Sequence, residues 1–200
     1  MNNKLINTIV ESRLNQVLIN ELDSYLINDV KEAYNLQEIV NKRLSSSGLG
    51  EIIGYKIGCT NESIQKELGV NNPIFGPIFK NRIIENNKKI SIKDFIKVGV
   101  ECEIYVKISK EINENTNYNI NNIKNFIDNY GVSLELVENR FLNIKKNKIE
   151  HIIIDGSLGN SIILGKEISN HSSNFSKFIG RLFINNKEVY SNFADTILGD

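Results

Sequence analysis

The first fifty residues place their hydrophobic side chains at a helical period. Apolar residues recur every three or four positions from Ile6 to Leu22, which predicts one amphipathic helix over this range. A second helix is predicted to begin after Asp29, because Asp29 and Glu32 have the spacing of a capping box. Its apolar positions continue to Leu44, and the Ser and Gly residues of "SSSGLG" then end it. Two helices therefore precede the first predicted strand.

Shorter elements follow these helices. "EIIGYKIGCT" predicts a strand in which glycines flank Lys56 on both sides, and the following "TN" can cap a short helix that ends at Gly69. The stretch "NNPIFGP" at 71–77 contains both prolines of the chain. Proline and glycine restrict and redirect the backbone, so this stretch is predicted to be a shaped loop.

Between residues 98 and 108 the period changes to two. Apolar and polar side chains alternate, which predicts a strand with Glu101 and Glu103 on one face and apolar residues on the other. Exposed glutamates are common, so a water-facing strand is the usual explanation for such a pair. The alternative is that the two carboxylates bind a cation.

The last third of the chain again mixes predicted helices and strands. "IKNFIDNY" at 123–130 predicts a helix, and the next strand, 132–141, carries Glu135 between two leucines. "HIIIDGSLGNSIILG" at 151–165 predicts a strand, a tight loop and a second strand. "RLFINNKEVYS" at 181–191 predicts a hairpin that turns at its two central asparagines.

Charge and cysteine content exclude several classes of function. Lys plus Arg and Asp plus Glu are balanced at 24 each, and the short basic segments at 87–93 and 144–148 lack interleaved aromatic residues. No nucleic-acid partner is therefore expected. The two cysteines, Cys59 and Cys102, have no zinc-binding spacing and fit a reducing cytoplasm. No apolar stretch approaches the length of a membrane span, so we expect a soluble cytoplasmic protein without a membrane partner.

Three carboxylates and one lysine are the candidates for chemistry. Glu135 lies in an apolar setting, and with Glu101 and Glu103 it would complete an oxygen site for a hard cation such as Mg²⁺. Lys56 could act as a proton shuttle or hold an anionic substrate. Composition alone favours a surface lysine whose charged end reaches water.

Read in order, these segments resemble the 2-keto-4-pentenoate hydratase and 4-oxalocrotonate decarboxylase branch of the fumarylacetoacetate hydrolase superfamily. "GYKIGCTNESIQKELGVNNPIFGPIF" is similar to the family's G-x-K-x-G-x-T, L-G-V and P-x-[FY]-G signature. "VECEIYVKI" resembles its metal-binding E-x-E strand, and "SLELVENR" resembles its A-L-E-I-V-D-S-R segment. The similarity runs in a single order from about residue 25 to the end.

The resemblance implies an α+β fold in which N-terminal helices pack on a mixed β-roll of the fumarylacetoacetate hydrolase type. It divides the chain into an N-terminal helical segment, 1–50, and a catalytic β-roll domain, 51–200. The family continues beyond "FADTILGD" into further elements that close the roll, so the roll is expected to be incomplete. The resemblance to the family also suggests that this protein forms a homo-oligomer.

The resemblance further implies how the site works. It assigns Mg²⁺ or Mn²⁺ to Glu101, Glu103 and Glu135, proton transfer or substrate binding to Lys56, and substrate contacts to four other residues: Ile74, Phe75, Asp155 and Ser157. The implied substrate is a small 2-oxo or 2-hydroxy carboxylate. Asp155 and Ser157 stand in "DGSL", where the family has D-N-x-S.

Two reactions and one inactive state remain open. The overall similarity favours a metal-dependent hydratase acting on 2-hydroxypenta-2,4-dienoate, which is the enol form of 2-keto-4-pentenoate. Hydratases of the family typically carry Asp at the position of Ile74, so the apolar Ile74 favours decarboxylation of a 4-oxalocrotonate-type substrate. The missing C-terminal portion leaves a non-catalytic truncated remnant as the third possibility.

Overall fold

The computed structural model describes residues 2–20, 22, 25–169 and 175–194. The chain forms two compact units, the first from 1–101 with 135–162 and the second from 102–134 with the residues after 162. It passes between them inside three strands, β4 (Val98–Ile108), β5 (Ile127–Glu138) and β6 (Gly159–Leu164). The assignment of 1–50 and 51–200 to separate roles stays a prediction.

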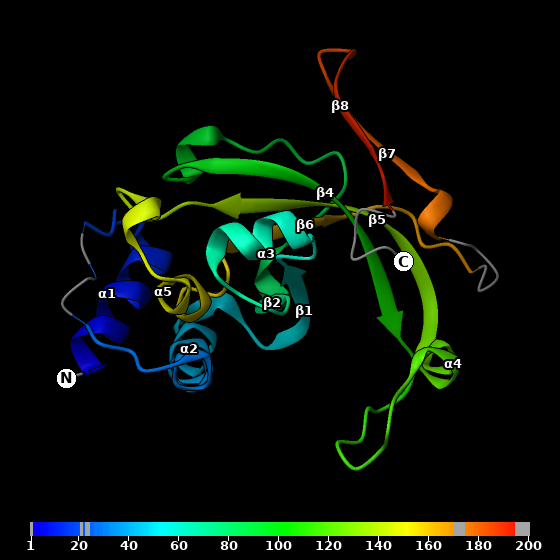
Figure 1. The fold of residues 1–200 in the computed structure, drawn as a ribbon. Coiled ribbons are helices and arrows are strands. Elements are labelled where there is room, and N and C mark those ends of the chain that lie inside the picture. The colour runs from blue at the N-terminus through cyan, green and yellow to red at the C-terminus, as the bar shows by residue number, and fades with distance from the viewer. Residues whose placement is uncertain (1, 21, 23–24, 170–174, 195–200) are drawn as a thin grey trace. The chain divides into compact units, whose positions relative to one another are not determined.

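The helices of unit 1 bury the stripes that the sequence predicts. Helix α2 (Val30–Leu44) packs against α1 (Asn2–Asn15) and α5 (Ile149–Ile154) (Figure 1). Asp29 caps α2 as predicted, because its carboxylate accepts a hydrogen bond of 2.7 Å from the Glu32 backbone N–H. The other half of the capping box differs, because the Glu32 carboxylate accepts from the Asn28 N–H at 2.9 Å. A π-helical turn, Ser45–Leu49, continues from the helix and ends before Gly50.

The prediction of one helix from Ile6 to Leu22 is wrong beyond Asn15. Gln16 has a φ of 56°, in the left-handed region that ends a right-handed helix. The following segment is extended, and the Ile19 N–H donates to the Arg140 carbonyl at 2.8 Å. Ile19 is still buried, but through this tertiary pairing rather than through a helical stripe, and Leu22 is buried although it lies beyond the helix.

The stretch predicted as a loop at 71–77 enters a strand at Ile74. Strand β2 (Ile74–Phe79) pairs antiparallel with β1 (Ile52–Gly58), and Lys56 stands opposite Gly76. Both strands of a two-stranded sheet are edge strands, where the missing N–H of Pro77 can face away from its partner. Proline therefore did not exclude a strand here.

Between these strands, α3 (Glu62–Leu68) begins and ends as predicted. The Asn61 side chain accepts a hydrogen bond of 2.8 Å from the Ser63 N–H, and Gly69 ends the helix with a φ of 69°. After β2, a 3₁₀ turn (Lys80–Arg82) leads into the short strand β3 (Ile83–Ile84). Another 3₁₀ turn, Ile92–Asp94, precedes β4.

A four-stranded sheet has the order β3-β6-β5-β4. Its strand β4 confirms the strand predicted at 98–108, although exposure does not alternate along it, and β5 begins earlier than expected, at Ile127. The helix predicted at 123–130 is therefore wrong beyond Phe126: helix α4 (Ile120–Ile123) and a 3₁₀ turn (Lys124–Phe126) precede the strand.

The strand predicted at the start of 151–165 is wrong, because residues 149–154 form helix α5 after a 3₁₀ turn, Ile144–Lys146. His151 and the three isoleucines after it are all buried. A short apolar run that is buried on every side has no visible period, so sequence alone could not separate helix from strand.

The hydrophobic core described by the structure lies in unit 1. It joins α1, α2 and α5 to the β1-β2 sheet through residues that include Ile9, Val40, Phe79 and Ile153, each exposed by 1% or less. Among the described residues, no helix is long and apolar enough to cross a membrane.

Unit 2 contains the predicted hairpin. Strands β7 (Ile179–Ile184) and β8 (Lys187–Phe193) pair antiparallel after a 3₁₀ turn, Phe175–Lys177. Asn185 and Asn186 have φ values of 51° and 62°, the left-handed conformation that a two-residue hairpin turn requires. This prediction is confirmed.

Candidate functional site

Lys56 points into unit 1 from the middle of β1. Exposed and partly buried residues alternate along the strand, and Lys56 lies on the covered side with only 10% of its side chain exposed. The surface position that composition favoured for this lysine is therefore wrong. Gly54 and Gly58 share the covered side, and an added Cβ at Gly58 would lie only 3.5 Å from Lys56 Nζ.

Glu135 is the direct partner of Lys56. Its side chain is 4% exposed, and Oε1 lies 3.3 Å from Lys56 Nζ. Burial raises the pKa of the Glu135 carboxyl above its ordinary value, the Lys56 ammonium opposes this rise, and the Glu101 charge adds to it. The pair thus brings one ammonium and one carboxylate together in a covered position.

A second carboxylate of unit 1 lies close to Glu135. A carboxylate oxygen of Glu101, on β4, is within 4.8 Å of a carboxylate oxygen of Glu135. Glu103 stands two residues after Glu101, so the strand's period of two directs both side chains to the same face. Carboxylate oxygens are the donors that hard divalent cations prefer, and a cation would relieve the repulsion between like charges. The donor set therefore fits Mg²⁺ or a similar ion.

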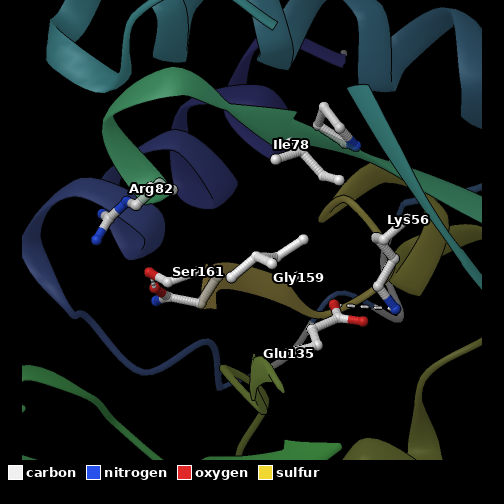
Figure 2. A pocket seen from close by; sticks show the side chains of 9 residues that line it. Lys56, Ile78, Arg82, Glu135, Gly159 and Ser161 are labelled. Atoms are coloured by element: carbon white, nitrogen blue, oxygen red, sulfur yellow. Dashed lines mark hydrogen bonds and ion pairs between the residues drawn. The ribbon is translucent and has the colours of Figure 1, made fainter. Parts of the chain in front are cut away.

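Lys56 and Glu135 line a pocket of about 220 Å³, a volume that includes space open to solvent (Figure 2). The wall of the pocket is formed by residues of β1, β2, β5 and β6 and by one arginine of the turn after β2: Lys56, Pro77, Ile78, Arg82, Glu135, Gly159, Asn160, Ser161 and Ile162. A Cβ at Gly159 would lie 3.6 Å from Glu135 Oε1. Glycine therefore leaves space beside the carboxylate.

Of the four predicted substrate-contact residues, Ile74 and Phe75 begin β2. Ile74 is 5% exposed, and Phe75 is 40% exposed with its ring stacked on Tyr34 at 4.2 Å between centroids. The Phe75 N–H donates to Tyr34 Oη at 3.1 Å, and the Phe75 carbonyl accepts from Ser157 Oγ at 2.9 Å. Ser157 thus holds the start of β2 in place.

Asp155 lies in the interior and is 0% exposed. Its Oδ2 accepts a hydrogen bond of 2.9 Å from Arg140 Nη1, and its carbonyl oxygen accepts one from Arg13. Burial raises the pKa of the Asp155 carboxyl, and Arg140 followed by Arg13 opposes the rise. Asp155 is not among the residues that line the pocket in Figure 2, so its substrate contact stays a prediction.

Sequence reasoning missed a buried network of charges next to the site. Arg140 is 1% exposed and contacts both Asp155 and Glu138, with Nη2 3.0 Å from Glu138 Oε2. Arg13 is also buried, and desolvation followed by the Arg140 charge lowers its pKa to about 9. Glu138 and Arg140 stand two apart in "VENR", the spacing of one strand face, and this is the one signal that could have indicated the network.

The fold is of the mixed α/β class, with N-terminal helices and a mixed sheet, and it closely matches a solved structure. Over 100% of this chain and 76% of the other, it superimposes with a TM-score of 0.87 on 4-oxalocrotonate decarboxylase from Pseudomonas putida G7, which was solved with magnesium and adipate. The two sequences are 18% identical. The predicted fold class is therefore confirmed.

Sequence relatives agree with the resemblance. The chain is 31% identical over 84 residues to the TodF product hydratase of Pseudomonas putida, and 25% identical over 147 residues to 2-keto-4-pentenoate hydratase 1 of Dechloromonas aromatica. It is 23% identical over 158 residues to 4-oxalocrotonate decarboxylase of Pseudomonas putida. These matches span 31%, 55% and 59% of the relatives' own lengths and 42%, 73% and 79% of this chain.

No protein-family model matches the chain. The curated homologues are nevertheless named 2-keto-4-pentenoate hydratase and 4-oxalocrotonate decarboxylase, which confirms the resemblance predicted from the motifs.

Proposed function

We propose that the protein is a divalent-metal-dependent lyase that acts on short 2-oxo or 2-hydroxy carboxylates. The observation that carries this proposal is the covered Lys56 ammonium, 3.3 Å from Glu135 and beside a second carboxylate, Glu101. The first candidate reaction is hydration of 2-hydroxypenta-2,4-dienoate, because most of the similar curated proteins carry the hydratase name.

In this proposal Glu101, Glu103 and Glu135 hold Mg²⁺ or Mn²⁺. The bound ion supplies Lewis acidity that stabilises an enolate formed from a 2-oxo acid. Lys56 lies within reach of the same place and either moves a proton or binds the substrate carboxylate. The apolar side chains of Pro77, Ile78 and Ile162 would exclude water from the carbon chain of the substrate.

Decarboxylation of a 4-oxalocrotonate-type acid is the second candidate. The observation that favours it is Ile74, a 5% exposed apolar side chain at the position where hydratases of the family typically carry Asp. A hydratase needs a group that transfers a proton to or from the added water, and Ile74 cannot do this. Departure of CO₂ places no such demand on this position.

The cellular setting is part of the proposal. Free thiols at Cys59 and Cys102 support the cytoplasm as its location. The proposed partner is a small 2-oxo or 2-hydroxy acid, and the proposed assembly is a homo-oligomer.

Calorimetric titration with Mg²⁺ and oxalate, an enolate mimic, tests the proposed site. We expect oxalate to bind only together with Mg²⁺, and Glu103→Gln to abolish this coupled binding. Glu67→Gln is the matched control, because Glu67 is exposed on α3 and loses the same charge. Absence of coupled binding in the unmodified protein would instead support a non-catalytic remnant.

Turnover assays then choose between the reactions. The protein is supplied with Mg²⁺ and either 2-hydroxypenta-2,4-dienoate or 4-oxalocrotonate, and loss of diene absorbance or release of CO₂ is followed. Glu103→Gln should remove all turnover of whichever substrate is used. Residual turnover in that variant contradicts the proposed ligand set.

A further inference from the structure

Gln37 is a polar residue on the buried face of α2. This face is otherwise mostly apolar, with Ala33, Leu36, Val40 and Leu44 buried beside it, and only 3% of Gln37 is exposed. Burial of a primary amide costs free energy unless hydrogen bonds replace those that it made to water. The apolar face of the helix does not require an amide, so the role of Gln37 depends on the elements that it bonds.

The Gln37 amide joins two backbone segments. Its Nε2 donates to the Ile153 carbonyl of α5 at 2.6 Å and to the Phe75 carbonyl of β2 at 3.2 Å. An amide nitrogen carries two protons, and these two contacts use both. The Phe75 N–H donates at 3.1 Å to the hydroxyl of Tyr34, which lies one turn earlier on the same helix. Helix α2 therefore bonds both backbone polar groups of Phe75 and, through Gln37, the end of α5.

The contact with Phe75 acts on the strand opposite Lys56. In an antiparallel pair, successive residues direct their N–H and carbonyl groups alternately toward and away from the partner strand. Phe75 uses both groups away from β1, so those of Gly76 face β1, where Gly76 stands opposite Lys56. An added Cβ at Gly76 would collide with the Gly156 carbonyl, so β2 has little room to shift. The position of the Lys56 backbone therefore depends on how α2 holds β2.

The contact with Ile153 acts on the backbone at the other side of Lys56. After α5 the chain turns through residues 156–158, which have φ values of 55° to 86°, and then reaches Gly159. An added Cβ at Gly159 would lie 3.8 Å from Lys56 Cε and 3.6 Å from Glu135 Oε1. The end of α5 thus sets how closely the backbone at Gly159 approaches the pair of Lys56 and Glu135.

We propose that Gln37 is a positioning residue for Lys56: by holding the Phe75 and Ile153 carbonyls, it fixes the Lys56 ammonium against Glu135. Gln37 does not line the pocket, so it acts through the backbone of β2 and of the turn after α5. The catalytic consequence rests on the proposed function, in which Lys56 moves a proton or binds the substrate carboxylate. A displacement of about 1 Å of such a group costs roughly 100-fold in rate.

Selective ¹⁵N labelling of lysine tests the positioning without any need for turnover. Gln37→Met has a similar length but no donor, so both hydrogen bonds are lost. We expect the Nζ resonance of Lys56, identified by its absence in Lys56→Arg, to shift in Gln37→Met. Val40→Ala is the control, because it removes buried volume one turn along the same face and lowers stability while the Gln37 amide stays intact. Its Lys56 resonance should match that of the unmodified protein.

Turnover gives the functional readout. The assay uses Mg²⁺ and whichever candidate substrate the unmodified protein converts. Here kcat/KM should fall by about 10- to 100-fold in Gln37→Met and stay within about threefold in Val40→Ala. Urea denaturation of both variants shows whether the loss of activity follows stability or the loss of the amide.

The two readouts separate the possible failures. If the Lys56 resonance shifts equally in both variants or in neither, or if it shifts without loss of kcat/KM, the positioning role is wrong and the proposed function stands. If the unmodified protein neither turns over nor binds oxalate with Mg²⁺, the proposed function fails, and the resonance alone decides whether Gln37 positions Lys56. If Gln37→Met does not fold by circular dichroism, Gln37→Asn replaces it, because its shorter amide cannot span the same two carbonyls.

Discussion

Replacement of Arg140 by methionine tests whether the buried charge network stabilises unit 1. Arg140 is 1% exposed, and its guanidinium lies 2.9 Å from Asp155 and 3.0 Å from Glu138. It also donates to the Gly159 carbonyl at 3.1 Å. Methionine has similar length and no charge, so Arg140→Met removes these contacts and leaves two buried carboxylates without their shared cation.

The magnitude follows from this imbalance. Removing one partner of a buried ion pair costs about 3–5 kcal/mol, because the remaining charge is left desolvated. Glu138 keeps two other hydrogen-bond donors, Asn160 and the Ile96 N–H. The Asp155 carboxylate loses the one side-chain partner that lies within hydrogen-bond distance, so most of the loss should arise there. With a urea m value of about 2–3 kcal/mol/M, the unfolding midpoint should fall by about 1–2 M.

Urea denaturation followed by circular dichroism measures the shift. Lys80→Met is the matched control, because the Lys80–Glu51 pair has a similar distance of 2.9 Å but is 63% and 67% exposed. Asp155→Asn combined with Arg140→Met should recover part of the loss, since the orphaned charge is then absent. The reasoning is refuted if Arg140→Met lowers the midpoint no more than Lys80→Met does.

Three further predictions concern backbone and titration. Gly76→Ala should cost about 1–3 kcal/mol in urea unfolding, because its Cβ would collide with the Gly156 carbonyl, whereas Gly54→Ala meets only a side-chain atom at 3.8 Å and should be tolerated. Asn186→Val should destabilise the hairpin by about 1–2 kcal/mol relative to Asn186→Gly, because Asn186 has a φ of 62°; equal hydrogen-exchange protection in the two variants would contradict this. Burial raises the pKa of Asp155 above 3.8, so the native state binds more protons than the unfolded chain above that pH. The stability of the unmodified protein relative to Asp155→Asn should therefore be greatest at low pH and fall as the pH rises through the native pKa. Urea unfolding of both proteins at a series of pH values from about 3.5 to 7 measures this difference. A difference that grows with pH would contradict the prediction.

Local features of the sequence predicted local structure well. Asp29 and Asn61 cap their helices through side chains that reach the backbone only two or three residues away. The two asparagines of the hairpin, 185 and 186, adopt the left-handed conformation that their side chains tolerate. The alternation at 98–108 likewise fixed a strand, because a period of two is a property of the strand itself.

Where the local signal was ambiguous, the tertiary environment decided. The run at 151–154, whose complete burial hides any period, forms a helix that packs against α2, and Pro77 was accommodated in a strand because its sheet has only two strands. Ile19 and Leu22 continued an apolar period yet lie beyond the end of the helix, where Ile19 pairs with the segment at 140–142. None of these outcomes follows from residues near in sequence.

The same division applies to the candidate site. The sequence by itself determined which side chains could do chemistry. Short local motifs, each recognisable without knowledge of the fold, contain Lys56, Glu101, Glu103 and Glu135. Only the tertiary structure decided that Lys56 is covered and lies 3.3 Å from Glu135, and that Arg82 shares their pocket. The physical reason is that desolvation and Coulomb interactions depend on distance through space, which the order of residues along a chain does not specify.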